Sequence, residues 1–241
     1  MSLSLLRDRV LAANQQIAIR GLALHTFGNA SGILRAEKVE DTVVAIKPSG
    51  VPYAELTAGD LVLTNLEGRV LKGRLKPSSD LDTHLLLYRE FPEIGGIVHT
   101  HSEFATAWAQ AQRPIPCFGT THADYFHGAI PVTDSLSAEE TREDYVLNTG
   151  RVIARRLREI AADAMDIPGM LVAGHAPFAW GQSAEQAVEH AELMEFIARL
   201  AYRTVLLGGP EQGIAAHLIE QHHRRKHGPD ASYGQPGRGR A

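Results

Sequence analysis

The chain has 241 residues, of which 44% are hydrophobic and 22% are charged. This size and composition predict one globular domain with its own core, and a formal net charge of -4 supplies no basic surface field of the kind that nucleic-acid binding requires. The single cysteine, Cys117, excludes an internal disulfide, and charged residues appear too early for a secretory signal. No apolar run approaches the ~20 residues of a membrane span, so we expect a soluble protein of the reducing cytoplasm.

The predicted elements begin with an amphipathic helix over residues 3–20, with Gly21 as its stop signal. Residues 26–33 mix glycines with small polar side chains, which is typical either of a tight hairpin turn or of backbone that approaches a ligand closely. Residues 43–47 read as a strand that runs into a turn. At its end, Lys47 is either a solvated surface charge or part of an anion site.

Residues 60–73 contain two short predicted strands joined by a turn. A helix with apolar positions at helical spacing is predicted to follow over residues 81–91. Ser79 and Asp82 have the spacing of a capping box, and free amides at a helix start also favour an anion. Asp80 therefore has two interpretations, as a capping residue or as part of a ligand site.

The pattern in residues 97–101 is the most informative feature of the chain. In a strand, His99 and His101 project from the same face with ~6.6 Å between their Cα atoms, a spacing that lets two imidazoles bind one transition metal. Two ordinary histidines in a half-buried strand are the alternative. A third predicted strand, over residues 168–175, ends in His175, which is either another ligand or a structural residue.

Further helices are expected in four places: residues 102–112, 138–164, 184–201 and 211–227. The second begins with a capping box at Ser137 and has a possible break at Gly150. Between the helices, the polar and aromatic loop 119–128 either lines a site or lies on the surface. The basic cluster at residues 222–228 is interpreted as a solvated patch at a helix C-terminus.

The strands and helices intermingle without a repeating βα unit or a GxGxxG turn, which favours an α/β sandwich over a nucleotide-binding Rossmann fold. Several motifs, in unbroken order up to Gln235, closely resemble the pentulose-phosphate 4-epimerases of the class II aldolase/adducin family. These motifs are Gly28-Asn29-x-Ser31-Gly32, Ile46-Lys47-Pro48-Ser49-Gly50, Lys76-Pro77-Ser78-Ser79-Asp80, His99-Thr100-His101, Gly119-Thr120-Thr121-His122-Ala123-Asp124-Tyr125-Phe126, Gly174-His175-x-Pro177-Phe178-Ala179-Trp180-Gly181, Arg225-Lys226-His227-Gly228 and Tyr233-Gly234-Gln235.

The resemblance implies a three-layer α/β/α fold around a central, mostly antiparallel sheet. It also implies a homotetramer with active sites between subunits. Residues 1–228 would form a single catalytic domain, and residues 229–241 a flexible tail that carries Tyr233. We expect Tyr233 to become ordered only when substrate binds.

The resemblance also implies a role for each matching position. His99, His101 and His175 would bind one zinc ion per subunit, with Asp80 in the family's acidic ligand position. The sequence does not determine whether manganese or another divalent ion can replace zinc. Substrate and its phosphate would be held by Gly28, Asn29, Lys47, Ser49, Gly50, Ser78 and Ser79. The proton-transfer pair would be Asp124 and Tyr233, contributed by a neighbouring subunit and assisted by Thr120 and Arg225.

The implied activity is the interconversion of L-ribulose 5-phosphate and D-xylulose 5-phosphate, in the breakdown of either arabinose or ascorbate. The hydrogen on carbon 4 is not acidic, so inversion is expected to proceed by retro-aldol cleavage and rejoining of the bond between carbons 3 and 4. The first alternative is an aldolase of the fuculose- or rhamnulose-phosphate type, whose members carry glutamate where this chain has Asp80. The second is a non-catalytic adducin-like interaction module, which is expected to lack the metal histidines.

Overall fold

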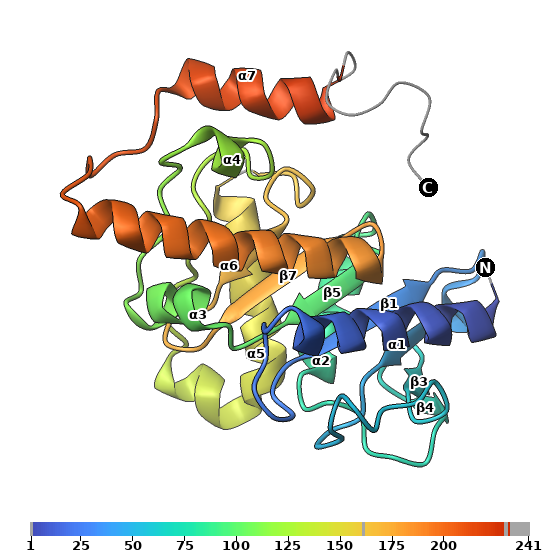
Figure 1. The fold of residues 1–241 in the computed structure, drawn as a ribbon. Helices are drawn as coiled ribbons and strands as arrows, with labels where there is room; N and C mark the ends of the chain where they lie inside the picture. The colour runs from blue at the N-terminus through green and yellow to red at the C-terminus, as the bar shows by residue number, and fades with distance from the viewer. Residues whose placement is uncertain (1, 161, 229–230, 232–241) are drawn as a thin grey trace.

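The computed structural model describes residues 2–160, 162–228 and 231. Within these residues, seven strands form one sheet in the order β4-β3-β2-β1-β5-β7-β6, and every pair of neighbouring strands is antiparallel (Figure 1). The strands are β1 (Asn29–Leu34), β2 (Val43–Ile46), β3 (Val62–Thr64), β4 (Val70–Lys72), β5 (Gly96–His99), β6 (Gly169–Leu171) and β7 (Pro177–Gly181). The expected antiparallel central sheet is confirmed.

Helices cover both faces of this sheet (Figure 1). One layer contains α1 (Leu3–Ile19), α3 (Glu103–Gln110) and α6 (Ala184–Leu206), and the other contains α2 (Leu81–Glu90) and α5 (Ala138–Glu159). Neighbouring residues of β1 face opposite layers: Gly32 lies against α1 and the start of α6, whereas the hydroxyl of Ser31 contacts α2. Alternation along a strand thus produces the three-layer arrangement that the resemblance implied.

Two short elements and one helix lie outside these layers: η1 (Val39–Asp41), α4 (Thr120–Ala123) and α7 (Ala216–His227). Helix α7 packs on α4, at the top of Figure 1. It begins five residues later than the sequence predicted. In the part of the chain that the structure describes, no helix combines the length and apolar character needed to cross a membrane.

Three local predictions are wrong. Residues 26–33 do not form a hairpin turn, because from Asn29 onward they are the central strand β1. The predicted capping box at α2 is absent, since the N-cap residue is Asp80 and its side chain makes no capping hydrogen bond. Helix α5 has its non-helical residue at Asp144 and not at Gly150, where a Cβ atom would lie 3.2 Å from Leu86. Gly150 therefore allows α5 to pack closely on α2. In contrast, the capping box at Ser137 is confirmed.

The two histidine-bearing strands are shorter than predicted. Strand β5 stops at His99, so His101 lies in the loop that follows. Strand β6 stops at Leu171, and His175 lies in a tight turn between β6 and β7 where its N–H donates to the carbonyl of Val172 (3.0 Å). Gly174 precedes it with a φ of 69°, a conformation that glycine adopts at no steric cost. These shifts place both histidines just beyond strand ends.

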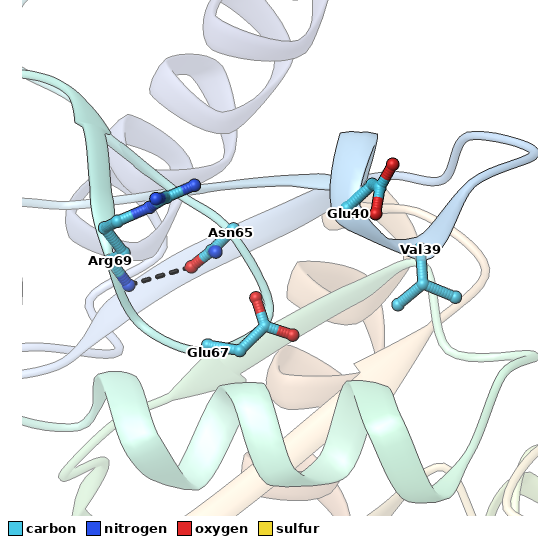
Figure 2. Close-up of a pocket in the computed structure, with 5 residues that line it drawn as sticks. All are labelled: Val39, Glu40, Asn65, Glu67 and Arg69. Atoms are coloured by element: carbon cyan, nitrogen blue, oxygen red, sulfur yellow. Dashed lines mark hydrogen bonds between the residues drawn. The ribbon is translucent and has the colours of Figure 1, made fainter.

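A surface hollow of about 540 Å³ lies between η1 and the β3–β4 turn (Figure 2). It is lined by Val39, Glu40, Asn65, Glu67 and Arg69, and the side chain of Asn65 accepts a hydrogen bond from the backbone N–H of Arg69 (2.8 Å). None of the residues predicted to bind metal or substrate lines this hollow. The candidate site is therefore elsewhere, at the histidine-bearing strand ends.

Candidate metal centre

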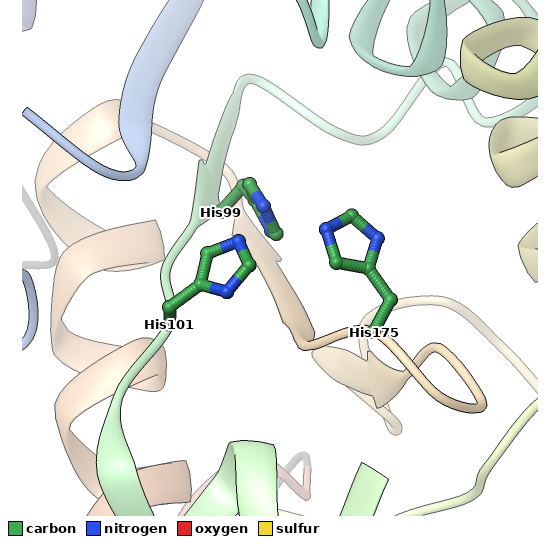
Figure 3. A group of neighbouring side chains, drawn as sticks. All are labelled: His99, His101 and His175. Carbon is green, nitrogen blue, oxygen red and sulfur yellow. The ribbon is translucent and has the colours of Figure 1, made fainter. Parts of the chain in front are cut away.

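Three histidines from two distant segments meet at one point (Figure 3). The ring centroids of His99 and His101 are 4.9 Å apart, and that of His175 lies 5.0 and 5.1 Å from them. One ring nitrogen from each histidine can be chosen so that all three lie within 4.8 Å of one another. The cause is strand pairing, because β5 and β7 are neighbours with His99 opposite Phe178, which brings the turn before β7 next to the end of β5.

Contacts outside the cluster orient two of the rings. Nδ1 of His99 lies 3.0 Å from the carbonyl of Pro177, which can only accept, so Nδ1 carries the hydrogen and Nε2 keeps a free lone pair. The same ring stacks on Phe178 with centroids 4.2 Å apart. Nδ1 of His175 is 3.1 Å from the phenol oxygen of Tyr145. Two of the three imidazoles are thus held in place before any ligand binds.

The electrostatic environment keeps these imidazoles neutral. Burial lowers the pKa of His99 and His101, and it lowers the pKa of His175 to about 4, with the other two rings adding to the effect. Neutral imidazole is the form that coordinates a metal. Three convergent neutral nitrogens are a donor set that suits a divalent transition metal such as zinc, so the residues fit the expected ion.

Asp80 lies beside the histidine cluster at the start of α2. Its Oδ2 accepts a hydrogen bond from the side chain of Asn29 (2.7 Å). Burial acts to raise the pKa of Asp80, but the fields of His99 and His84 and the Asn29 hydrogen bond outweigh it, so the pKa lies below its usual value. Among the described residues, the group of mutually close ligand atoms contains the three histidines and not Asp80. An anionic carboxylate therefore stands next to the cluster rather than within it.

Two loops lie against each other near this carboxylate. The backbone N–H of Ser49 donates to the carbonyl of Lys76 (2.9 Å), and that of Ser78 donates to the carbonyl of Lys47 (3.0 Å). Asn29 joins them, because its side chain also donates to Oγ of Ser78 (3.0 Å). The structure thus brings together the segments carrying seven of the nine predicted substrate-binding residues: Gly28, Asn29, Lys47, Ser49, Gly50, Ser78 and Ser79. The other two, Thr120 and Arg225, lie with Asp124.

Lys47 is buried, with 1% of its surface exposed, so its interpretation as a solvated surface charge is wrong. Its Nζ lies 3.4 and 3.5 Å from the carbonyls of Thr26 and Pro48 and 4.8 Å from the ring of Tyr53. No carboxylate among the described residues pairs with it. Burial also lowers the pKa of Lys47. A buried ammonium with only carbonyl and aromatic neighbours is suited to an anionic ligand.

Gly28 connects this region to the histidines. Its φ is 75°, and a Cβ atom on it would lie 2.6 Å from the carbonyl oxygen of His99. Only glycine lets the chain pass this close to the end of β5.

Asp124 forms a separate cluster with α7. Its carboxylate contacts Nδ1 of His222 (3.0 Å) and the guanidinium of Arg225 (3.2 Å), and its carbonyl contacts Nε2 of His227 (2.8 Å). The backbone N–H of Asp124 donates to the carbonyl of Thr120, at the start of α4 (2.9 Å). The interpretation of the basic cluster as simply solvated is therefore wrong.

No interaction between described residues joins Asp124 to the three histidines. The second member of the expected proton-transfer pair, Tyr233, lies outside the residues that the structure describes. Three residues that contact the predicted site were not predicted from the sequence: His84, Tyr145 and His222. Only His84 had a local signal, because it lies four residues after Asp80 and thus on the same helix face.

Comparison with known proteins agrees with this geometry. Residues 8–202 match the family model described as the class II aldolase and adducin N-terminal domain. The chain is 47% identical over 230 residues to proteins named L-ribulose-5-phosphate 4-epimerase UlaF from Salmonella paratyphi B and Salmonella typhi, covering 95% of this chain and 98% of each relative.

Solved structures share the fold. An L-fuculose 1-phosphate aldolase has a TM-score of 0.78 at 22% identity, covering 93% of this chain and 97% of that one. The L-fuculose-1-phosphate aldolase from Thermus thermophilus has a TM-score of 0.65 at 22% identity, covering 87% and 100%. The chain therefore belongs to the class II aldolase and adducin family.

Proposed function

We propose that this chain is a metal-dependent sugar-phosphate epimerase that interconverts L-ribulose 5-phosphate and D-xylulose 5-phosphate. The observation that carries the proposal is the convergence of His99, His101 and His175 beside Asp80, in a chain 47% identical to relatives named for that activity. The non-catalytic alternative is disfavoured, because all three histidines are present and converge, and outside contacts orient two of them.

The three histidines are the proposed zinc ligands, and Asp80 is the acidic group that completes the site. A zinc ion held there would supply Lewis-acid stabilisation of the enediolate that forms when the bond between carbons 3 and 4 breaks, an effect worth several kcal/mol. Because the imidazoles are neutral, they leave most of the charge of a divalent ion available for that purpose.

The phosphate is proposed to bind in the two joined loops. Lys47 supplies the positive charge, while Ser49, Ser78 and Ser79 supply hydroxyl donors, and Gly50 leaves open space beside them. Holding the phosphate keeps the glycolaldehyde phosphate fragment in the site while its carbonyl turns to present the opposite face.

Epimerisation also needs a proton acceptor on one face and a proton donor on the other. Asp124 and Tyr233 are proposed for these two roles, with Thr120 and Arg225 assisting. Because Asp124 has no contact with the histidines of its own chain among the described residues, we propose that a neighbouring copy supplies it, in a homotetramer. His222 and Arg225 then hold the Asp124 carboxylate in place from their position on α7.

The decisive experiment supplies L-ribulose 5-phosphate to the zinc-loaded protein and follows D-xylulose 5-phosphate in a coupled assay. The control reaction offers lactaldehyde and dihydroxyacetone phosphate, the substrates of an aldolase running in reverse. We expect epimer formation and only slow condensation. Efficient condensation without epimer formation would show that the protein is an aldolase and not an epimerase. A purified protein that binds no stoichiometric metal would exclude both activities.

Mixed assemblies of two inactive variants test whether each active site takes Asp124 from a neighbouring subunit. The variants His99→Asn and Asp124→Asn should each be inactive as pure assemblies. Mixed assemblies from co-expression should recover about a quarter of the sites, because half of the chains carry an intact metal centre and half an intact Asp124. Lack of any recovery in mixed assemblies would mean that both groups act within one chain.

A further inference from the structure

His84 is a fully buried histidine behind the metal centre, with no role assigned so far. It lies one turn after Asp80 on α2, where its backbone N–H donates to the carbonyl of Asp80 (3.2 Å). Side chains on a helix lean toward its N-terminus, so the imidazole lies over the turn that carries Asp80. Its ring also meets Phe178 edge-on (6.0 Å), on which His99 stacks.

A chain of hydrogen bonds fixes one side of this ring. Nδ1 of His84 is 2.7 Å from Oγ of Ser31, which is 2.8 Å from the phenol oxygen of Tyr88. If His84 donated to Ser31 and Ser31 to Tyr88, the buried phenol hydrogen would have no acceptor among the described residues. In the opposite direction every hydrogen is used: Tyr88 donates to Ser31, and Ser31 donates to Nδ1.

This direction determines the other side of the ring. With Nδ1 accepting, the hydrogen of the neutral imidazole must be on Nε2, and burial lowers the pKa of His84 to about 3, which keeps it neutral. Nε2 is completely buried and has no hydrogen-bond partner among the described residues. Buried donors almost always have an acceptor. An anionic acceptor lies one helical turn away, because the backbone N–H of His84 donates to the carbonyl of Asp80 (3.2 Å), and only Oδ2 of the Asp80 carboxylate is engaged, by Asn29 and Ser78.

We propose that His84 is a positioning residue for the metal centre: Tyr88 and Ser31 direct its Nε2–H to the Asp80 carboxylate, and this second hydrogen bond holds Asp80 toward the metal when the ion binds. The carboxylate is then fixed from two sides, by Asn29 and by His84. The inference rests on the proposed function insofar as a metal binds at the three histidines.

Two amide variants separate this role from a structural one. The amide of His84→Gln reaches the position of Nε2 and keeps the donor to Asp80, whereas that of His84→Asn reaches the position of Nδ1 and keeps only the contact with Ser31. We expect His84→Asn to weaken zinc affinity about tenfold or more, and His84→Gln to retain most of it. Zinc affinity is measured by competition with a chromogenic chelator, and melting temperatures are measured on the metal-free proteins.

We expect His84→Gln to bind zinc more tightly than His84→Asn. In melting temperature of the metal-free protein we expect the opposite order, because His84→Asn keeps the contact with Ser31. A packing role would make His84→Asn the better variant in both metal-free stability and zinc affinity, and that result would overturn the proposal. A double-mutant cycle adds a second check, because His84→Asn should cost no further zinc affinity once Asp80→Asn is present. Additive losses would mean that His84 does not act through Asp80.

The failure of this inference is distinct from a failure of the proposed function. If the parent protein binds zinc and epimerises L-ribulose 5-phosphate while both amide variants match it in zinc affinity, only the role of His84 is refuted. If the parent protein itself binds no zinc, the proposed function fails and the role of His84 fails with it.

Discussion

Replacing Lys47 by methionine should strengthen the fold and weaken substrate binding at the same time. The ammonium is buried, and among the described residues it meets two carbonyls, at 3.4 and 3.5 Å, and the face of Tyr53 at 4.8 Å. These contacts are too long to offset the free energy that is lost when a charge is removed from water. Methionine has a similar length and carries no charge, so it can occupy the same space without that cost.

The two effects can be estimated separately. Replacing buried charges by apolar groups of similar volume often stabilises a fold by about 1–4 kcal/mol, and the lost cation–π contact removes about 0.5–1 kcal/mol of this. We therefore expect the variant to be about 1 kcal/mol more stable, which raises the melting temperature of a protein this size by about 2–4 °C. A charge-assisted hydrogen bond to phosphate is worth about 1.5–3 kcal/mol, so KM should rise about 10- to 100-fold.

Thermal unfolding and the coupled epimerase assay measure both quantities on the same preparation. Lys76→Met is a matched control, because Lys76 is exposed in the neighbouring loop and contributes its backbone carbonyl to Ser49. The control should change neither value beyond error. A Lys47→Met protein that is less stable than the parent, or one with an unchanged KM, would refute the interpretation of Lys47 as an unpaired charge kept for the phosphate.

Three further predictions concern the metal centre and its surroundings. Gly28→Ala should lower the free energy of unfolding by about 1–3 kcal/mol in urea titrations and weaken zinc binding, since its Cβ atom would clash with the carbonyl of His99. Gly21→Ala, with a similar φ of 67° but open space around it, should cost only about 1 kcal/mol and spare zinc binding; equal effects would contradict the clash. Tyr145→Phe should weaken zinc affinity severalfold by releasing Nδ1 of His175, with an unchanged melting temperature for the metal-free protein; an unaltered zinc affinity would mean that the contact has no orienting role. Burial lowers the pKa of His122 and His175 to about 4, below the ordinary value of 6.5, so the unfolded chain takes up protons first as pH falls. The metal-free protein should therefore keep the full contribution of these histidines to its stability above about pH 6.5 and lose that contribution progressively toward pH 4. A free energy of unfolding in urea that does not change with pH across this window would argue against buried neutral histidines.

The proposed ligand set shows how much of a site a local sequence pattern can predict. Strand alternation was sufficient to predict that His99 and His101 lie together, and their ring centroids are 4.9 Å apart although the strand ends at His99. His175 was a candidate because an apolar strand led up to it. Its actual position is in a turn, because the pairing of β6 with β7 ends at Leu171. The local sequence does not show where that strand ends.

The failures have a common origin in long-range contacts. Ser79 and Asp82 have capping-box spacing, yet the start of α2 makes no such contact, and the Asp80 side chain instead bonds Asn29, 51 residues earlier in the chain. The basic cluster of α7 was read as solvated, although His222 and Arg225 bind Asp124, about a hundred residues away. A short-range pattern cannot reveal a partner that only folding brings near.

The sequence by itself determined the residue types at the centre: three imidazoles, a carboxylate, a lysine and a set of hydroxyls and glycines, in an order that resembles one family of enzymes. Only the tertiary structure decided which groups are buried and which face one another. Lys47 became a buried charge among Thr26, Pro48 and Tyr53, and His84 a buried imidazole between α2 and β1. The physical reason is that burial and electrostatic environment are properties of packing, set by segments that the chain brings together from far apart.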